Sequence, residues 1–181
     1  NDNDKQRMAD LGVSAIVAPY WACMDDYYWN VYLPIMSSKD KLDTQYPMQS
    51  LEKLGINVAF HSDDFVTDPD MGWLFYSAQT RCLPQKIFNL WYGKDSKEYK
   101  RDTNPYASQN PEDYGKGVTP ILPLKQYDER LDFDQVMEAA TINGAKTVGL
   151  ADECGSLEKG KKGNIIVLNM DLRKTNEENI E

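Results

Sequence analysis

Short apolar runs alternate with helical patterns along the first third of the chain. Residues 5–11 predict the end of a helix, and the apolar, β-branched run at 13–18 predicts a strand. The same order returns at 47–55, where apolar positions have helical spacing, and at 58–60, a second short apolar run. Because neither run alternates with polar residues, both are typical of strands buried on both faces. The pattern therefore predicts the alternation of a parallel α/β sheet or barrel.

Three further elements are predicted downstream. Residues 71–82 predict a helix, and residues 133–148 predict another whose apolar face contributes to the core. Asp132 and Gln135 have the spacing of a capping box at the start of the second helix. The apolar run at 165–168 predicts the last strand of the chain.

Residues 84–127 fit neither a helical nor a strand pattern. They are rich in Lys, Asp, Asn, Pro, Gly and Tyr. A loop of this length is usually functional or disordered. Its aromatic residues favour an ordered lid or an oligomer contact over a plain linker, with disorder as the third interpretation.

The composition excludes several classes of protein. The chain has 181 residues, enough for one domain, and a net charge of −9, whereas a nucleic-acid-binding protein would show a basic face. No apolar run approaches the roughly 20 residues that cross a bilayer. No signal peptide is visible at the start, although one could have been removed upstream of Asn1, and we expect a cytoplasmic protein. Three cysteines without a CxxC pair predict buried or incidental thiols.

The most informative stretch follows the second predicted strand. His61, Ser62, Asp63 and Asp64 come directly after it, and His61 is the only histidine of the chain. In a parallel α/β barrel, side chains just past the C-terminal end of a strand point into the mouth of the active site. Alternatively, Asp63 or Asp64 only caps the next segment, since Asp is common at such turns.

The C-terminal third carries the motifs of a known family. Residues 137–145 read Met-Glu-Ala-Ala-Thr-Ile-Asn-Gly-Ala, and residues 155–168 read Gly-Ser-Leu-Glu-Lys-Gly-Lys-Lys-Gly-Asn-Ile-Ile-Val-Leu. These motifs resemble the amidohydrolase superfamily, in particular its Amidohydrolase-3 branch of YtcJ-like enzymes. Upstream, residues 8–19 resemble the helix and strand at the seventh barrel position, and residues 55–63 resemble the eighth strand.

The resemblance implies an α/β fold made of the last βα units of a TIM-like (β/α)8 barrel, plus the C-terminal strands of a small β-sandwich. Residues 1–148 would form the C-terminal part of the barrel, with 84–127 as a long insert. Residues 149–181 would form part of the composite β-sandwich and a frayed tail.

The resemblance also implies a reaction. Family members hold one or two divalent metal ions, usually zinc, and hydrolyse an amide-type C–N bond of a small molecule with metal-activated water. Asp63 matches the aspartate that binds metal or takes the proton of that water. His61 stands where many relatives have Gly, and it either faces the substrate or is structural. Tyr20 and Trp21 either line a substrate pocket or pack a loop, and Arg81 either binds a substrate carboxylate or forms a salt bridge.

One departure limits what this chain can do. Family metal sites need a His-x-His pair and further histidines, which a chain with one histidine cannot supply. We therefore expect a C-terminal fragment, inactive and without bound metal by itself, that associates with its missing N-terminal part or forms homo-oligomers. The alternative hypothesis is a non-catalytic, partner-binding or dimerising domain derived from a half-barrel. A reading frame that continues upstream of Asn1 with a His-x-His motif would favour the fragment.

Overall fold

The computed structural model describes residues 1–23, 27, 31–36, 41, 44–81, 84, 87, 129–169 and 171–174. The chain forms two compact units that interleave along the sequence. The first unit contains residues 1–19, 46–69 and 129–174, and the second contains residues 20–45, 70–128 and 175–181. The predicted insert at 84–127 lies outside the described residues apart from positions 84 and 87, and the predicted division at residue 148 stays a prediction.

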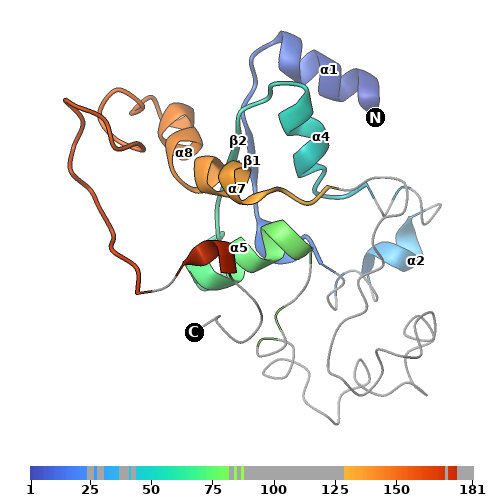
Figure 1. Cartoon of the computed structure of the whole chain (residues 1–181). Helices are drawn as coiled ribbons and strands as arrows, with labels where there is room; N and C mark the ends of the chain where they lie inside the picture. Colours follow the sequence, from blue (N-terminus) through green and yellow to red (C-terminus); the bar gives the residue numbers. More distant parts are fainter. Residues whose placement is uncertain are drawn as a thin grey trace. The chain divides into compact units, whose positions relative to one another are not determined.

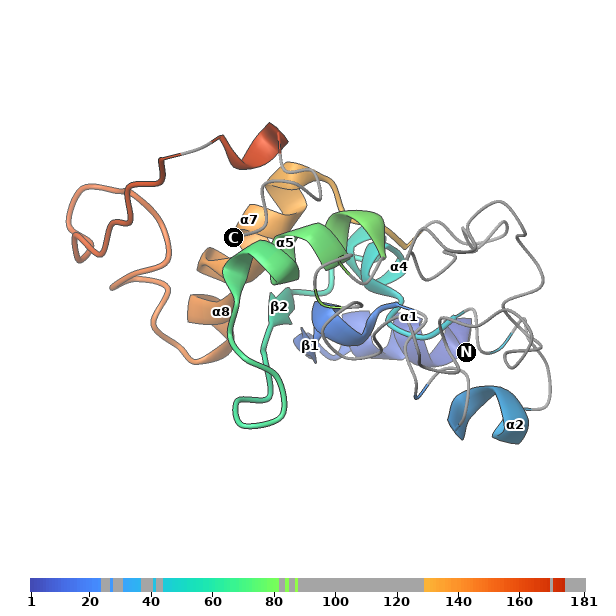
Figure 2. The same cartoon turned by 90° about the horizontal axis from the view of Figure 1, so that it is seen from below.

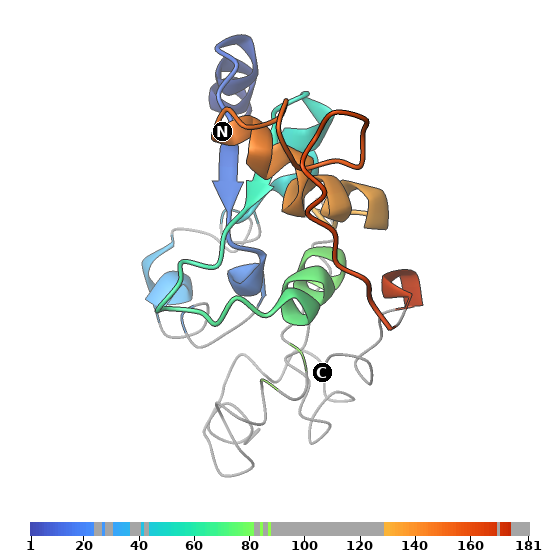
Figure 3. The ribbon, with the colours of Figure 1, turned by 90° about the vertical axis from the view of Figure 1, so that its left-hand side faces the viewer.

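The first unit is built on a two-stranded parallel sheet. Its strands are β1 (Ala15–Val17) and β2 (Val58–Phe60), and Figure 3 shows both arrows pointing the same way. The paired residues are Ala15 with Val58, Ile16 with Ala59 and Val17 with Phe60. Helix α1 (Asp2–Asp10) precedes β1, and helix α4 (Met48–Lys53) precedes β2. The predicted order of helices and strands is therefore confirmed, and the described chain is a mixed α/β structure.

Two consecutive helices, α7 (Phe133–Ala140) and α8 (Ile142–Thr147), pack against β2 (Figures 1 and 2). The predicted capping box is confirmed, because Asp132 Oδ1 accepts the backbone N–H of Gln135 while Gln135 Oε1 accepts that of Asp132. The prediction of one helix over 133–148 is wrong, since the backbone leaves helical geometry at Thr141, with φ −128° and ψ −91°. The Thr141 hydroxyl donates to the carbonyl of Met137, and such a bond competes with the regular helix.

The core of the first unit joins the sheet to its helices. Ala15, Leu51, Ile56 and Val58 form a buried apolar cluster, against which side chains of α1 and the strand ends pack. Each fully buried Leu, Ile or Val contributes about 1.5–3 kcal/mol relative to exposure. The strands are short, so these side chains hold the sheet in register more than the backbone ladder does.

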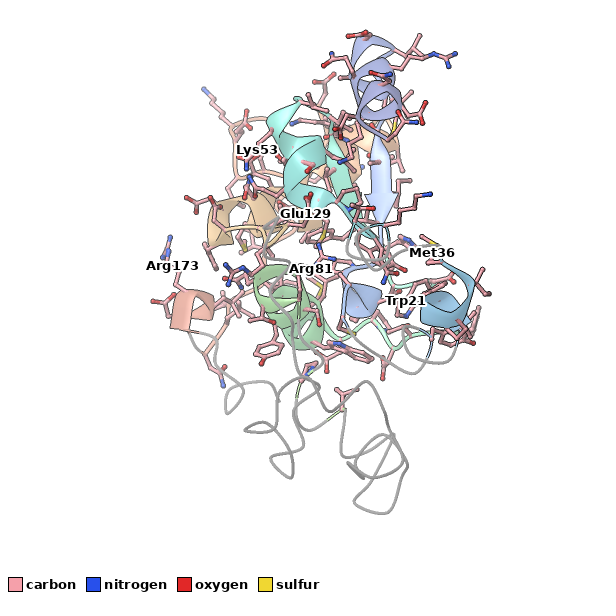
Figure 4. The ribbon with its side chains drawn as sticks, turned by 90° about the vertical axis from the view of Figure 1, so that its right-hand side faces the viewer. Trp21, Met36, Lys53, Arg81, Glu129 and Arg173 are labelled. Carbon is pink, nitrogen blue, oxygen red and sulfur yellow. The ribbon has the colours of Figure 1, made fainter. Side chains whose placement is uncertain are left out.

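A buried carboxylate from a distant part of the chain caps α4. This helix begins after Pro47 without a side-chain cap of its own. Glu129, whose side chain is only 2% exposed, accepts hydrogen bonds from the backbone N–H of Ser50, at 2.7 Å, and from the Ser50 hydroxyl. Figure 4 shows Glu129 at the lower end of α4. The N–H groups of a first helical turn lack helical partners, so this carboxylate satisfies one of them.

Asn57 ties the entry of β2 to α8. Its Nδ2 lies 3.1 Å from Ser14 Oγ, 3.1 Å from the carbonyl of Asn143 and 3.0 Å from Thr147 Oγ1. Two amide hydrogens serve three acceptors, so one hydrogen is shared. The backbone carbonyl of Asn143 therefore helps to hold the segment before β2 against α8.

The second unit contains α2 (Leu33–Ile35) and α5 (Met71–Thr80), and the short helix η1 (Pro19–Trp21) leads into it. The helix predicted over 71–82 is confirmed, although it ends two residues earlier. Asp70 caps its start by accepting the backbone N–H of Trp73 at 3.0 Å. The middle of α5, from Trp73 to Ala78, is buried on every side, as expected of an apolar helix in a core.

The predicted strand at 165–168 is wrong. These residues lie outside any strand, and no described segment forms a ladder with them. Their side chains are 52–90% exposed. A β-branched run becomes a strand only when a neighbouring strand supplies hydrogen bonds, and composition cannot show whether that neighbour is present.

Candidate functional site

The candidate site begins where β2 ends. The backbone N–H of His61 donates to the carbonyl of Val17 at 3.0 Å, which continues the pairing of β1 and β2 by one residue. His61 is therefore held at the carboxyl edge of the parallel sheet, beside the end of β1. His61 and Ser62 are half-buried, whereas Asp63 and Asp64 are exposed. The sheet thus delivers two carboxylates to the edge where parallel α/β proteins place their functional groups.

Asp63 opens a tight turn with an unusual backbone. The N–H of Val66 donates to the carbonyl of Asp63 at 2.8 Å and closes the turn. Asp63 has a φ of +56° and Phe65 a φ of +78°. Asp enters this left-handed region more readily than most residues, whereas a bulky residue does so rarely. Residues held in such conformations cluster at functional sites, so the turn at 63–66 is a candidate site on geometric grounds.

Tyr20 belongs to the second unit and is almost completely buried, with 1% of its side chain exposed. Its hydroxyl donates to the carbonyl of Asp70 at 3.0 Å, and its ring meets that of Trp73 edge-on with centroids 5.0 Å apart. These are the contacts of a packing residue that fixes the start of α5. Trp21, labelled in Figure 4, is half-buried on η1. A role of either residue in substrate binding stays a prediction.

Arg81 ends α5 with a left-handed backbone of φ +58°. Its Nη2 donates to the carbonyl of Gln45 at 2.7 Å, so one contact of the guanidinium is with the backbone. Because α5 has 10 residues, its two ends lie about 15 Å apart. The hydroxyl of Tyr20, at the start of α5, and Arg81, at its end, are therefore not brought to one point. A substrate-binding role for Arg81 stays a prediction.

The donors needed for a metal ion can be compared with what the chain supplies. In the part of the chain that the structure describes, no group of three or more His, Cys, Asp or Glu side chains is placed to hold one. A zinc ion takes about four ligands, of which catalytic sites draw three from protein. The described residues alone therefore do not make up such a site, and a metal-binding role for Asp63 stays a prediction.

Sequence reasoning missed one charged group with unusual surroundings. Glu52 lies on α4, and its Oε1 is buried without a hydrogen-bond partner. Burial raises the pKa of the Glu52 carboxyl above its usual value of 4.5, and the carboxylates of Glu138 and Asp132 raise it further against the lowering effect of Lys146. The helical spacing of α4 was visible in the sequence, but the approach of acidic residues from α7 was not.

None of the helices among the described residues has the length and apolar character needed to cross a membrane.

Comparison with known sequences and structures adds to this geometry. A sequence profile of the amidohydrolase family matches residues 1–181. The chain is 46% identical over 95 residues to a protein of Teredinibacter turnerae named 5-methylthioadenosine/S-adenosylhomocysteine deaminase, covering 52% of the chain and 20% of the relative. It is 35% identical over 135 residues to a probable imidazolonepropionase of Bos taurus, covering 70% of the chain and 32% of the relative. The chain thus matches about a fifth to a third of the length of these relatives.

The fold also has a counterpart among solved structures. The crystal structure of an uncharacterized metal-dependent hydrolase from Pyrococcus horikoshii aligns over 100% of this chain and 29% of its own, with a TM-score of 0.66 and 19% sequence identity. At that identity the likeness concerns the fold. The profile match extends over the motifs at 137–145 and 155–168 that suggested the resemblance. This chain therefore belongs to the amidohydrolase family.

Proposed function

We propose that this chain is the C-terminal part of a metal-dependent hydrolase that cleaves an amide-type C–N bond of a small molecule. Membership of the amidohydrolase family supports the reaction class. The name of one relative, a deaminase, and the description of the structural counterpart as a metal-dependent hydrolase agree with it. The short share of each relative that the chain matches is the reason to propose a longer active protein.

One observation carries the assignment of Asp63. Its exposed carboxylate stands on a backbone-closed turn at the carboxyl edge of the parallel sheet, directly after the end of β2. In our proposal Asp63 accepts and relays the proton of the attacking water, a task that suits a positioned carboxylate. A divalent metal, which we propose is zinc, would supply the activation of that water. The ligands that the described residues lack would come from other parts of the protein.

The other site residues have supporting roles in this proposal. His61, pinned beside the end of β1 by its backbone bond to Val17, would present its imidazole next to Asp63. Within the second unit, Arg81 would order the segment that it contacts at Gln45. We further propose that β1 and β2 are neighbouring strands of a (β/α)8 barrel, since they are parallel and each follows a helix.

The proposal is tested on the full-length protein that carries this sequence. The zinc-loaded protein would be screened for ammonia release from a panel of amides and amino-substituted heterocycles. We expect Asp63→Asn to lower kcat by about 10²- to 10⁴-fold, the usual range for a lost general acid–base group. Asp64→Asn is the matched control, because it removes the same charge one residue further along the same turn, and it should retain most activity. An Asp63→Asn protein as active as its parent would refute the assignment.

A second candidate function has one observation in its favour. The apolar run at 165–168 is exposed, and contiguous exposed apolar residues often mark an interaction surface. We propose that this segment pairs with another strand, either in a second copy or in the rest of the protein. Pairing between copies would appear in light scattering of the 181-residue chain as association that Val167→Lys weakens. A monodisperse monomer at high concentration would exclude pairing between copies.

A further inference from the structure

The turn that follows Asp63 carries a side chain that the fold does not use. Phe65 has a φ of +78°, and its side chain is 100% exposed. A positive φ is a genuine outlier for a bulky residue, because its Cβ crowds the backbone carbonyl. Full exposure also forgoes the stabilisation that burial of an aromatic ring provides. Both features lower the stability of the folded chain, and no burial of the Phe65 ring offsets them.

The backbone nevertheless fixes where this ring stands. The turn at 63–66 is closed by the bond from Val66 N–H to the carbonyl of Asp63, 2.8 Å long. It is anchored before its start by the bond from His61 to Val17, and after its end by Thr67, which is 4% exposed. The Cα atoms of Asp63 and Phe65 are two residues apart and so at most about 7 Å from each other. This spacing lets one small molecule contact both side chains when they lie on the same side of the turn.

We propose that Phe65 is a specificity-determining residue, which packs on a flat apolar group of the substrate beside the bond that Asp63 serves. This inference rests on the proposed function and narrows its substrate class to amides or amino compounds whose C–N bond is attached directly to a ring. Aromatic rings favour offset or edge-on contact with other flat rings, so Phe65 would select such molecules over aliphatic ones. Val66, 69% exposed in the same turn, extends the apolar surface.

Binding can be measured without any enzymatic activity. The ¹⁵N-labelled 181-residue chain would be titrated with benzamide and with acetamide, which carry the same amide with and without a ring. We expect benzamide to shift the amide resonances of residues 63–67 in a saturable manner, and acetamide to leave them in place. Phe65→Ala should weaken benzamide binding about 3- to 10-fold, the range for loss of one aromatic contact. Leu157→Ala is the control, because it removes another exposed apolar side chain, 77% exposed, outside the turn.

The backbone strain gives a second, independent test. Phe65→Gly relieves the positive φ and removes no packing, so this variant should unfold at a higher denaturant concentration than the parent. Its affinity for benzamide should fall as much as that of Phe65→Ala, because both variants lack the ring. A residue that merely supports the fold would give the opposite shift in stability. Equal affinity of Phe65→Ala and the parent for benzamide would overturn the inference. Changes in the amide resonance of Phe65 that depend on protein concentration alone would also overturn it, since a second copy of the chain would then cover the ring. Failure of the proposed function would appear separately, as an Asp63→Asn protein with undiminished activity.

Discussion

A single carbon added at Gly155 should disturb the fold. Gly155 lies in the loop after α8 with a φ of +94°. A Cβ built there would stand 2.8 Å from Ala145 Cβ and 2.9 Å from Ile142 Cα, both too close for a real contact. Ile142 Cα is a backbone atom, and Ala145 Cβ is bonded directly to the backbone of its own residue. Neither atom can therefore move away from the added Cβ without a shift of α8. The loop and α8 can therefore approach each other only because residue 155 has no side chain.

The expected cost of Gly155→Ala has two parts. The positive φ costs about 1–3 kcal/mol for a residue with a Cβ, and the forced contact with α8 costs about 1–3 kcal/mol more. Gly160→Ala is the matched control, because Gly160 also has a positive φ, of +98°, but nothing within 4 Å of its added Cβ. The difference between the two variants, about 1–3 kcal/mol, isolates the packing contribution.

Urea unfolding of the 181-residue chain, followed by tryptophan fluorescence and far-ultraviolet circular dichroism, measures both variants. Gly155→Ala should lower the midpoint clearly more than Gly160→Ala, with an unchanged m-value. Adding Ala145→Gly should recover part of the loss, because it removes the nearest contact at 2.8 Å. Equal midpoints for the two single variants would refute the reasoning, since backbone strain alone would then explain both.

Two further predictions concern α4. Glu129→Ala should destabilise the chain by about 2–4 kcal/mol in urea unfolding, because it removes both hydrogen bonds of the buried carboxylate and leaves the part-buried backbone N–H of Ser50 without this partner. Ser50→Ala removes only the hydroxyl bond and should cost about 1 kcal/mol, and equal costs would show that the backbone bond contributes nothing. Glu52→Gln should stabilise the chain at pH 7 by at most about 1 kcal/mol, since solvent screens this half-buried group. Its pKa is raised in the folded state, so the folded chain binds more protons than the unfolded one above pH 4.5 and loses stability as pH rises through the folded pKa. The stabilisation by Glu52→Gln should therefore vanish below about pH 4, and stabilisation that persists there would contradict the charge argument. Glu138→Gln removes one carboxylate that repels Glu52 and should give part of the same stabilisation at pH 7.

The order of the elements around the sheet could be predicted from local pattern alone. The apolar runs at 13–18 and 58–60 became β1 and β2, and Asp132 and Gln135 form the predicted capping box. These features depend on residues within a few positions of one another, so they can be predicted from the sequence. The family motifs were equally local, and the family assignment followed from them.

Contacts between distant residues decided the rest. Glu129 and Ser50, which it caps, are 79 positions apart in the chain, and no spacing in the sequence predicts their contact. The exposed run at 165–168 has the composition of a strand, but strand formation depends on a partner that composition does not supply.

The candidate site divides along the same line. The sequence by itself placed Asp63 after a strand end, because the apolar run and the acidic residues are adjacent in the chain. Only the tertiary structure showed that the N–H of His61 pairs with β1, that the turn at 63–66 has a left-handed backbone, and that Phe65 is fully exposed. The burial of Tyr20 against Trp73 could not be predicted from the sequence, since the two residues are far apart in the chain. The residue types that follow a strand can be predicted to lie at its end, because they are its neighbours in the chain. Burial and backbone strain depend on contacts between distant segments, which only the tertiary structure shows.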